Sequence, residues 1–293
     1  MKKNKNRITT VLLALVFLAG LSLLLYPTVS DYWNSFHASR AVAAYAQEVA
    51  DLNGAEYDRL LEAARDYNAR AAQRSNTFAL TEAEQEEYQS LLNMDGTGIM
   101  GYIEIPNIKL SLPVYHGTEE SVLQIAVGHL DWSALPVGGE GTHCVLSGHR
   151  GLPSAKLFTN LDQLREGDTF TLRVLDEVLC YEVDQIRIVE PQDTAALLPE
   201  PGQDLCTLVT CTPYAINTHR MLVRGIRVPY NGEEETGDTP QVVQYQALHT
   251  GTVVKRIVDA WPWISVTGSV IIGGEALLLL LLLHRCKKRE EDD

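Results

Sequence analysis

The stretch TLVTCTPYAINTHRMLVRG, residues 207–225, combines two β-strand patterns with a short loop between them. Residues 205–211 and 220–228 are rich in Val, Leu, Ile and Thr, which favour strands. The residues between them include Pro and Asn, which favour turns. If the two strands pair as neighbours, the loop brings the end of the first next to the start of the second. Cys211 and Arg220 are therefore expected side by side at one edge of the sheet.

A thiol beside a guanidinium is a typical arrangement for a reactive cysteine. The cation favours the thiolate, which is the nucleophilic form of the side chain. The same cation can stabilise negative charge that develops on a carbonyl oxygen under attack. We therefore interpret Cys211 as a candidate nucleophile and Arg220 as its cationic neighbour.

A nucleophilic cysteine also needs a group that transfers protons. Of the eight histidines in the chain, His149 ends the strand pattern THCVLSGH directly before the turn-forming RGLP. A strand end that leads into a loop is a common position for a catalytic group. His143 begins the same run and is expected at its opposite end. His149 is thus the candidate, although a single histidine in such a position more often has a structural role.

Short strand patterns continue over roughly residues 100–230, and Gly, Pro, Asp and Asn separate them. This pattern predicts an all-β sandwich or barrel, with helical turns such as SAKLFTNLDQL. The segment is long enough to bury a core of its own. The runs that carry the prediction are GYIEIP, THCVLSGH, TFTLRVL, VLCYEVDQIRIVE, LCTLVTC and RMLVRGIRV.

The stretch THCVLSGHRGLPSAKLF followed by TLVTCTPYAINTHRMLVRG resembles the paired motifs of the sortase family. The family pattern is a TLxTC run, an Arg a few residues later and a His that closes an earlier strand. Residues 101–118 and 128–139 resemble the family's opening strands. The chain is most similar to class C, the pilin-polymerising sortases. CTPYxxNTHR after the cysteine, an N-terminal helical extension and a second apolar segment near the C-terminus carry that similarity.

The resemblance implies a closed sortase-type β-barrel of about eight strands with short helices. Carried over by position, Cys211 is the nucleophile, His149 the acid and base, and Arg220 the residue that stabilises the carbonyl oxygen. Thr210 matches the family's Thr before the cysteine and is expected to help shape the acyl site. No metal or organic cofactor is expected, since the His and Cys spacing does not resemble a zinc site.

The resemblance also implies a reaction. Cys211 attacks the Thr carbonyl of an LPXTG-like sorting signal and forms a thioacyl-enzyme, which a Lys amine of another pilin subunit resolves. The expected partners are pilin or surface-protein substrates and membrane lipid, and we expect a monomer. One alternative is a housekeeping sortase that attaches surface proteins to a peptidoglycan precursor. Another is a non-catalytic membrane scaffold that binds sorting signals.

Many class C enzymes carry a lid loop with an Asp-Pro-aromatic motif. The corresponding stretch here is Asn76-Thr77-Phe78, which keeps only the aromatic residue. We expect Phe78, in a loop near residues 74–80, to plug the apolar cleft as a lid that is looser than the family's usual one. An ordinary loop with one buried Phe is the alternative.

Two apolar segments, residues 8–26 and 264–283, each come close to the roughly 20 residues that span a bilayer. Lys and Arg precede the first and follow the second, which favours cytoplasmic termini and places residues 27–263 outside. We therefore expect a multi-pass protein of a Gram-positive cell membrane with an extracellular catalytic domain. The first segment has a cleaved signal peptide as its alternative. Glu275, within the second, is either functional or simply protonated or packed.

The remaining segments complete the expected domain order, in which residues 1–7 and 284–293 are cytoplasmic. Residues 27–99 form a helical extension, because good helix formers repeat at helical spacing over 35–75. A second short helix begins at Thr81, which has Glu84 at capping-box spacing. Polar residues rich in Gly and Pro open a linker or stalk over 231–263.

The formal net charge of -14 argues against nucleic acid as a partner, because phosphate binding needs clustered Lys and Arg. Five cysteines are too few for a disulfide-built scaffold. Cys206 lies five residues before Cys211 on one strand, so it points to the opposite face and is expected in the core. Cys144 and Cys180 are either buried thiols or a disulfide pair. Cys286, at the cytoplasmic membrane edge, is an inert thiol or a palmitoylation site.

Overall fold

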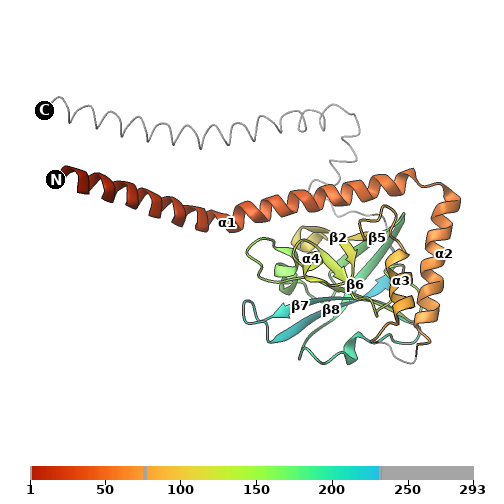
Figure 1. Ribbon diagram of the computed structural model, residues 1–293. Helices are drawn as coiled ribbons and strands as arrows, with labels where there is room; N and C mark the ends of the chain where they lie inside the picture. The colour runs from red at the N-terminus through yellow and green to blue at the C-terminus, as the bar shows by residue number, and fades with distance from the viewer. Residues whose placement is uncertain (1, 75–77, 231, 233–293) are drawn as a thin grey trace. The chain divides into compact units, whose positions relative to one another are not determined.

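A closed β-barrel forms the centre of the computed structural model, which describes residues 2–74, 78–230 and 232 (Figure 1). Eight strands follow one another around the barrel in the order β1-β2-β3-β4-β7-β8-β6-β5. The prediction of an all-β barrel of about eight strands is therefore confirmed. The strands are β1 (Ile99–Ile105), β2 (Leu110–His116), β3 (Val127–His129), β4 (Thr142–Ser147), β5 (Thr169–Val174), β6 (Glu177–Val189), β7 (Asp204–Thr212) and β8 (His219–Val228).

Strand β7 lies between β4 and β8 and pairs differently with each. It is parallel to β4, with Val209 beside Ser147, and antiparallel to β8. The loop between β7 and β8 returns the chain directly, so the end of β7 and the start of β8 lie at the same edge of the barrel. This is the arrangement that the strand patterns at 205–211 and 220–228 predict.

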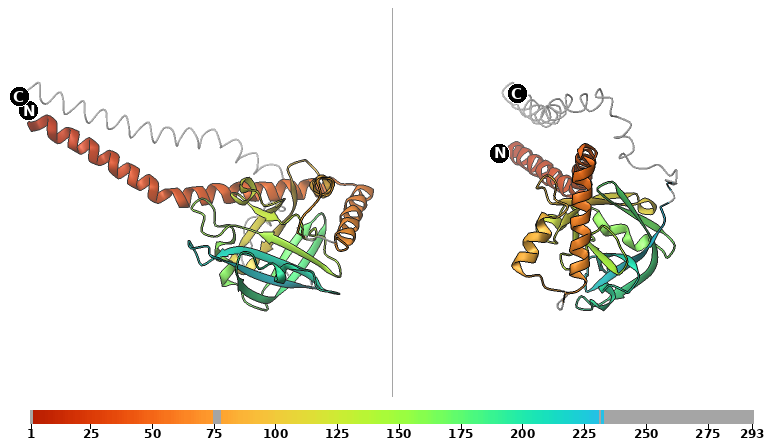
Figure 2. Two further views of the ribbon diagram at one scale, coloured as in Figure 1. Left: turned by 60° about the horizontal axis from the view of Figure 1, so that its bottom comes forward. Right: turned by 90° about the vertical axis from the view of Figure 1, so that its right-hand side faces the viewer.

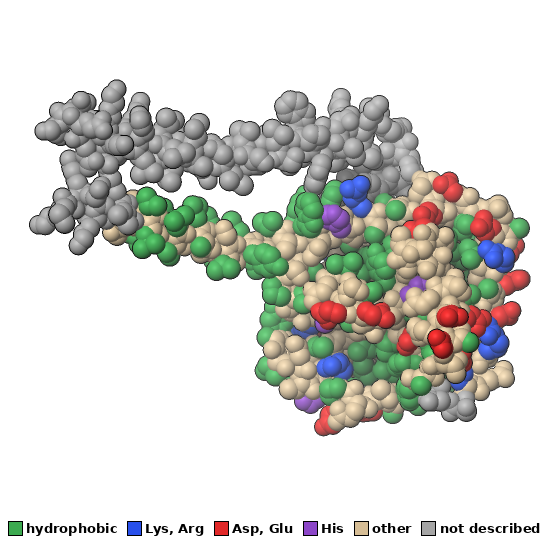
Figure 3. Space-filling view, in the orientation of Figure 1, with side chains coloured by type: hydrophobic (Ala, Val, Ile, Leu, Met, Phe, Trp, Pro, Cys, Tyr) green, Lys and Arg blue, Asp and Glu red, His purple; other side chains and the backbone are tan. Residues whose placement is uncertain are grey.

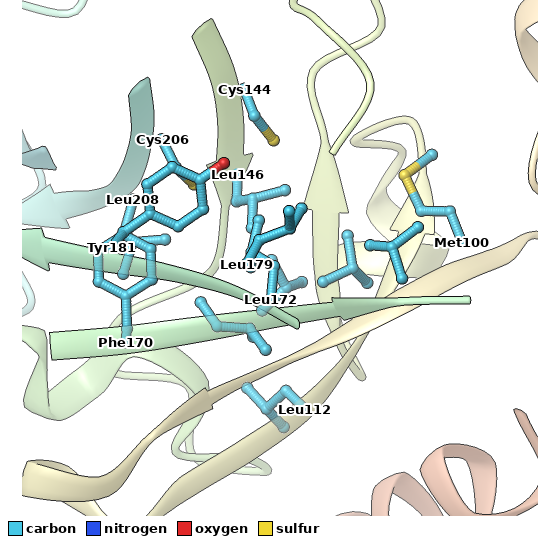
Figure 4. Packing of buried hydrophobic residues seen from close by; sticks show 14 of the residues in the cluster. Met100, Leu112, Cys144, Leu146, Phe170, Leu172, Leu179, Tyr181, Cys206 and Leu208 are labelled. Carbon is cyan, nitrogen blue, oxygen red and sulfur yellow. The ribbon is translucent and has the colours of Figure 1, made fainter. Parts of the chain in front are cut away.

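The barrel interior is filled by apolar side chains that alternate along the strands (Figure 4). Leu172, Leu208 and Tyr181 are examples, and the rings of Phe170 and Tyr181 stack with their centroids 5.5 Å apart. Full burial of one such side chain stabilises the fold by roughly 1.5–3 kcal/mol. This interior makes the strands a rigid support for residues on the outer face.

A second apolar cluster lies on the outer face of the barrel wall. It consists of Val145 of β4, Val209 of β7, Leu222 of β8 and Leu197, and we call it the outer apolar cluster. Trp132, Leu130, Val189 and Ala196 pack against it. Because side chains alternate along a strand, Val209 belongs to this cluster while Leu208 belongs to the interior.

Two further helices, α2 and α3, follow the N-terminal helix α1 (Lys2–Asp51), and Figure 2 shows both beside the barrel. The amide of Asn68, in α2 (Gly54–Ala71), exchanges hydrogen bonds of 3.0 and 2.8 Å with the backbone of Leu135. The capping box predicted at Thr81 is confirmed at the start of α3 (Glu82–Ser90). The short helices are α4 (Glu120–Leu123), η1 (Pro106–Ile108), η2 (Leu157–Gln163) and η3 (Ala195–Leu197).

Helix α1 has two parts with different surroundings. Its later part packs on the barrel, where the Tyr45 hydroxyl donates to the Met100 carbonyl (3.1 Å) and accepts from the Leu175 N–H (2.7 Å). Its earlier part presents apolar side chains outward (Figure 3). Among the described residues, α1 is the one helix that is both long enough and apolar enough to cross a membrane. The apolar segment at 8–26 and the start of the predicted helical extension lie in this one helix, which continues through Pro27.

Several predictions fall on residues outside the described part of the chain. They are the second apolar segment at 264–283 with Glu275, the linker over 231–263, the tail and Cys286. Of the other cysteines, Cys144, Cys180 and Cys206 are buried free thiols. Cys206 lies in the interior as predicted, and its register partner on β4 is Cys144 (Figure 4). Burial raises the pKa of the Cys206 thiol, so this thiol is kept protonated.

His143 is buried on the outer face and makes two hydrogen bonds. Its Nδ1–H donates to the Leu198 carbonyl (3.0 Å), because a carbonyl can only accept. Nε2 of the neutral ring then accepts from the Thr207 hydroxyl (2.7 Å). Burial, the largest cause, lowers the pKa of His143 below its ordinary value. The neutral ring is therefore the form that the fold stabilises.

We expect this histidine to make the fold sensitive to acid. Below about pH 6.5 an unfolded histidine binds a proton that the folded, pKa-lowered one does not, so the free energy of unfolding falls as the pH falls. In His143→Gln the thermal midpoint of the full-length protein in detergent should decrease less between pH 7.5 and 5.5 than in the native protein. His37→Gln, which removes an exposed histidine of α1, is the control. Equal decreases in His143→Gln and the native protein would contradict the expectation.

Candidate functional site

Cys211 and Arg220 are direct partners in the register of β7 and β8. Both side chains are partly exposed, whereas Thr210 and Thr212 on either side of Cys211 are buried. Cys211 shares its face of β7 with Val209, so it lies on the outer face of the barrel next to the outer apolar cluster. The structure therefore brings the predicted thiol and guanidinium to neighbouring positions on one surface.

His149 follows β4 by two residues and continues its parallel alignment with β7. Ser147 lies beside Val209, and the Gly148 N–H donates to the Val209 carbonyl at 3.1 Å. The Thr210 hydroxyl donates to the Gly148 carbonyl at 2.7 Å. Two residues beyond Ser147 and Val209 come His149 and Cys211, so the alignment sets these two side by side.

Gly148 is needed for this approach of the chain. A Cβ atom at this position would lie 2.7 Å from the ring of Phe158, which is closer than non-bonded carbon atoms come. The buried Phe158 also holds the next residue, because its N–H donates to the His149 carbonyl at 3.0 Å. Glycine before the histidine therefore lets the chain pass over the core and present His149 at the surface.

The Arg220 guanidinium is held at the start of β8 by backbone carbonyls. One nitrogen, Nη1, donates to the carbonyls of Asn217 (3.3 Å) and His219 (3.1 Å). Within the described residues it makes no ion pair, so its positive charge is not neutralised by a carboxylate. Its remaining N–H groups are able to donate hydrogen bonds to an oxygen of a ligand.

An apolar surface lies next to these three residues. The outer apolar cluster forms its floor, and Trp132 packs against that floor. The ring of Phe78 meets Trp132 edge-on, with ring centroids 4.9 Å apart and planes at 72°. Phe78 is 45% exposed, so its ring is not buried as the alternative of an ordinary loop expects, and the lid itself stays a prediction. Asn76 and Thr77 lie outside the described residues.

The other histidines of the barrel have structural partners. His116 lies between the carbonyls of Gly98 and Leu91, with ring nitrogens 2.9 and 2.8 Å away. The imidazole of His129 contacts the Tyr88 hydroxyl at 3.0 Å. His143 begins β4, at the opposite end from His149, as predicted. In the described part of the chain no group of three or more His, Cys, Asp or Glu side chains is arranged to hold a metal ion.

Two features of the site are missing from the sequence prediction. Arg150, directly after His149, is largely buried and reaches toward the loop after Cys211. The outer apolar cluster is assembled from single residues of several strands, so no continuous motif reveals it. The position of Arg150 beside His149 in the sequence is the one available signal for the first feature.

A sequence-family model described as the sortase domain matches residues 103–228. The crystal structure of sortase C1 from Streptococcus agalactiae is 48% identical and superposes with a TM-score of 0.64; the match covers 66% of this chain and 100% of that one. The chain belongs to the sortase family. Sortase C from Streptococcus pneumoniae is 41% identical, with a TM-score of 0.58, over 65% of this chain and 97% of that one. The family's cysteine chemistry and the class C similarity therefore agree with the sequence prediction.

Curated relatives match over a shorter part. Sortase D from Bacillus subtilis is 32% identical over 115 residues, which are 39% of this chain and 55% of that protein. Sortase A from Streptococcus agalactiae is 30% identical over 144 residues, which are 48% of this chain and 57% of that protein. The chain thus spans little more than half the length of these two sortases. Sortases are cysteine transpeptidases. The residues that the sortase-domain model matches include Cys211, His149 and Arg220.

Proposed function

We propose that this sortase cleaves an LPXTG-like sorting signal through a thioacyl intermediate and transfers the acyl group to a Lys amine, which polymerises pilin subunits. The observation that carries the proposal is the pairing of Cys211 with Arg220 on the outer face, with His149 aligned beside Cys211. A thiol, an imidazole and a guanidinium at one substrate amide provide a nucleophile, a proton carrier and an oxyanion partner.

In the first half-reaction the Cys211 sulfur attacks the Thr carbonyl carbon of the signal. Negative charge develops on the carbonyl oxygen, and the N–H groups of Arg220 that the backbone leaves free stabilise it. The C–N bond to the following Gly then breaks, and His149 donates a proton to the departing amine. A thioester between Cys211 and the substrate Thr remains.

In the second half-reaction an amine attacks the thioester carbon. His149, neutral after the first step, accepts the proton that the amine loses. The C–S bond breaks, the Cys211 thiolate returns, and the new bond is an isopeptide bond if the amine is that of Lys. Thr210 supports both steps, because its hydroxyl fixes the carbonyl of Gly148 directly before His149.

The proposal includes a location at the cell membrane. The apolar part of α1 is the first anchor, and residues 264–283 are a second one by composition. Lys and Arg outside both segments favour cytoplasmic ends and an extracellular barrel. Substrates that carry their own membrane segments then reach the barrel by diffusion in the same bilayer.

Mass spectrometry of the full-length protein in detergent tests this function. The protein is incubated with an LPXTG peptide, and a peptide of the same composition in scrambled order is the control. We expect an acyl adduct on Cys211 with the first peptide alone, and its transfer to added Lys-containing pilin peptides. Binding without an adduct would support a scaffold instead of an enzyme.

A housekeeping role is the second candidate function. It is favoured by the match to sortase A from Bacillus anthracis, which is 25% identical over 95% of that protein's length. The choice of amine separates the two roles. Faster release of the adduct by a peptidoglycan-type amine than by Lys-containing pilin peptides would favour wall anchoring over polymerisation.

We also propose that Phe78 belongs to a lid over the site. The two ends of its loop are held by an ion pair of 2.9 Å between Arg74 and Glu84, and Phe78 lies on Trp132 beside the outer apolar cluster. Phe78 is 45% exposed, which fits a lid that opens easily. A ring that occupies part of the apolar surface competes with the apolar side chains of a substrate.

Phe78→Ala is therefore expected to raise the rate of peptide cleavage at low substrate concentration by about two- to tenfold, because a larger fraction of the protein is open. Tyr230→Ala, which removes a partly exposed aromatic side chain beyond β8, is the matched control. The comparison uses initial rates with the same LPXTG peptide. A rate that is unchanged or lower in Phe78→Ala would exclude the lid.

A further inference from the structure

Arg150 is a buried cation that the reaction described above does not use. Its side chain is only 10% exposed, although arginine side chains are rarely buried without a defined role. Within the described residues its Nε–H is buried without a hydrogen-bond partner. Burying a guanidinium costs free energy, so the contacts of its other nitrogens need an explanation.

Those contacts join three separate segments of the chain. One terminal nitrogen, Nη2, forms an ion pair with Asp162 of η2. The other, Nη1, donates to the hydroxyl of Thr212 at 3.3 Å, directly after Cys211. The guanidinium carbon lies 6.0 Å from the centre of the Tyr214 ring, within the range of a cation–π contact.

Together with Thr210, these bonds enclose the reactive pair from both sides. Before His149, the Gly148 carbonyl accepts from the hydroxyl of Thr210. After His149, Arg150 donates to the hydroxyl of Thr212. Thr210 and Thr212 are the two neighbours of Cys211 in the sequence. His149 and Cys211 are thus the central residues of two short segments that are bonded to each other at both ends.

The segment after Arg150 also contacts η2 and the loop after β7. The Gly151 N–H donates to the Thr159 hydroxyl of η2 at 3.1 Å. A Cβ atom on Gly151 would lie 3.1 Å from the Tyr214 ring, so the chain packs closely under that ring. Helix η2 therefore supports Arg150 from one side, and the loop after β7 contacts it from the other.

We propose that Arg150 is a positioning residue that holds His149 at the correct distance and orientation for Cys211. The proposal deepens the function proposed above and rests on it. Arg150 acts through the backbone on which His149 lies and through Thr212, and it does not touch the substrate. Asp162 balances its charge, so a second free cation is not added beside Arg220.

Only arginine fits this position. The guanidinium presents N–H groups in a fixed planar fork, which here contacts a carboxylate and a hydroxyl in different segments. The ammonium of lysine is a single point, so in Arg150→Lys the charge stays but one of the two contacts is lost. Arg150→Lys is therefore expected to displace His149, although the positive charge at this position is kept.

The test measures how fast iodoacetamide alkylates Cys211 as a function of pH in the full-length protein, with peptide mapping to separate Cys211 from other thiols. The native protein, His149→Ala, Arg150→Lys, Arg150→Ala and Thr212→Val are compared. Arg173→Lys is the matched control, because Arg173 pairs with Glu104 at 2.8 Å where β5 meets β1, on the opposite wall of the barrel. Thermal midpoints check folding, so Thr212→Val and Arg150→Lys keep the test valid if Arg150→Ala does not fold.

We expect the pH profile of both Arg150 variants to move toward that of His149→Ala, Thr212→Val to move less in the same direction, and Arg173→Lys to match the native protein. With an LPXTG peptide, kcat should fall about 10- to 100-fold in Arg150→Lys, while KM stays within about threefold, since small displacements of a catalytic group cost this much. Unchanged alkylation profiles in folded Arg150→Lys and Thr212→Val would overturn the proposal. So would identical profiles of His149→Ala and the native protein, because Arg150 would have no proton carrier to position.

The alkylation readout needs no sorting peptide. A native protein that forms no acyl adduct would therefore contradict the proposed function, while the movement of the pH profile would still decide the role of Arg150.

Discussion

Replacing Cys211 with alanine is expected to abolish the acyl adduct with an LPXTG peptide. The side chain lies partly exposed beside Arg220, and it carries the only cysteine thiol of this surface among the described residues, since Cys144, Cys180 and Cys206 are buried. Removing a covalent nucleophile typically lowers kcat by at least about 10³-fold, and no other group replaces the sulfur. Intact-mass measurement after incubation with the peptide gives the result directly.

The control for this substitution is Cys180→Ala, which removes a buried thiol of β6 that faces Val228. It should keep the adduct and most of the activity. An adduct that persists in Cys211→Ala would mean that another residue is the nucleophile. In that case peptide mapping of the modified residue would identify it.

Arg220→Ala is expected to have the second largest effect. Single-turnover acylation should slow by about 10²- to 10³-fold, equivalent to roughly 3–4 kcal/mol, because removing one oxyanion partner costs this much in other enzymes. The acylation rate of Arg220→Lys should lie between those of Arg220→Ala and the native protein, since the charge is kept but the paired N–H groups are lost. KM for the peptide should change less than the acylation rate, because the contact strengthens as charge develops.

A general effect of positive charge must be separated from the specific one. Arg187 of β6 faces Leu222 of β8, one position further along the outer face from Arg220, and it is exposed. Arg187→Ala should change the acylation rate only slightly, because exposed surface charges interact weakly. Full activity in Arg220→Ala, or equal losses in the two variants, would mean that Arg220 is not the oxyanion partner.

Much of the fold can be predicted from short-range patterns. The runs of strand-favouring residues that become β5 and β7 are visible in the sequence, and the capping box at Thr81 marks the start of α3. The face on which each cysteine of β7 lies follows from counting along the strand. These predictions succeed because strand alternation and helix capping depend on residues close together in the sequence.

Other features depend on residues that are far apart and could not be predicted in this way. β3 has three residues, too few to show an alternation, and only the family resemblance indicated opening strands in this region. Trp132 looks like any aromatic residue of a loop until the outer apolar cluster is assembled around it. Arg150 shows its role only when β4, η2 and the loop after β7 meet. The sequence predicted the three candidate groups and Thr210 beside them, but neither Arg150 nor the outer apolar cluster.

The closure of the barrel has a consequence for how the protein recognises peptides. Every strand has a neighbour on both sides, so the wall that carries Cys211 offers no unpaired edge on which an incoming chain could continue the sheet. A bound signal must then be recognised through its side chains instead of through a ladder of main-chain bonds. Replacing single side chains of the signal should accordingly weaken processing more than methylating its amide nitrogens away from the cleaved bond. An enzyme that recognises its substrates in this way can accept many different proteins, provided that each carries the same few residues.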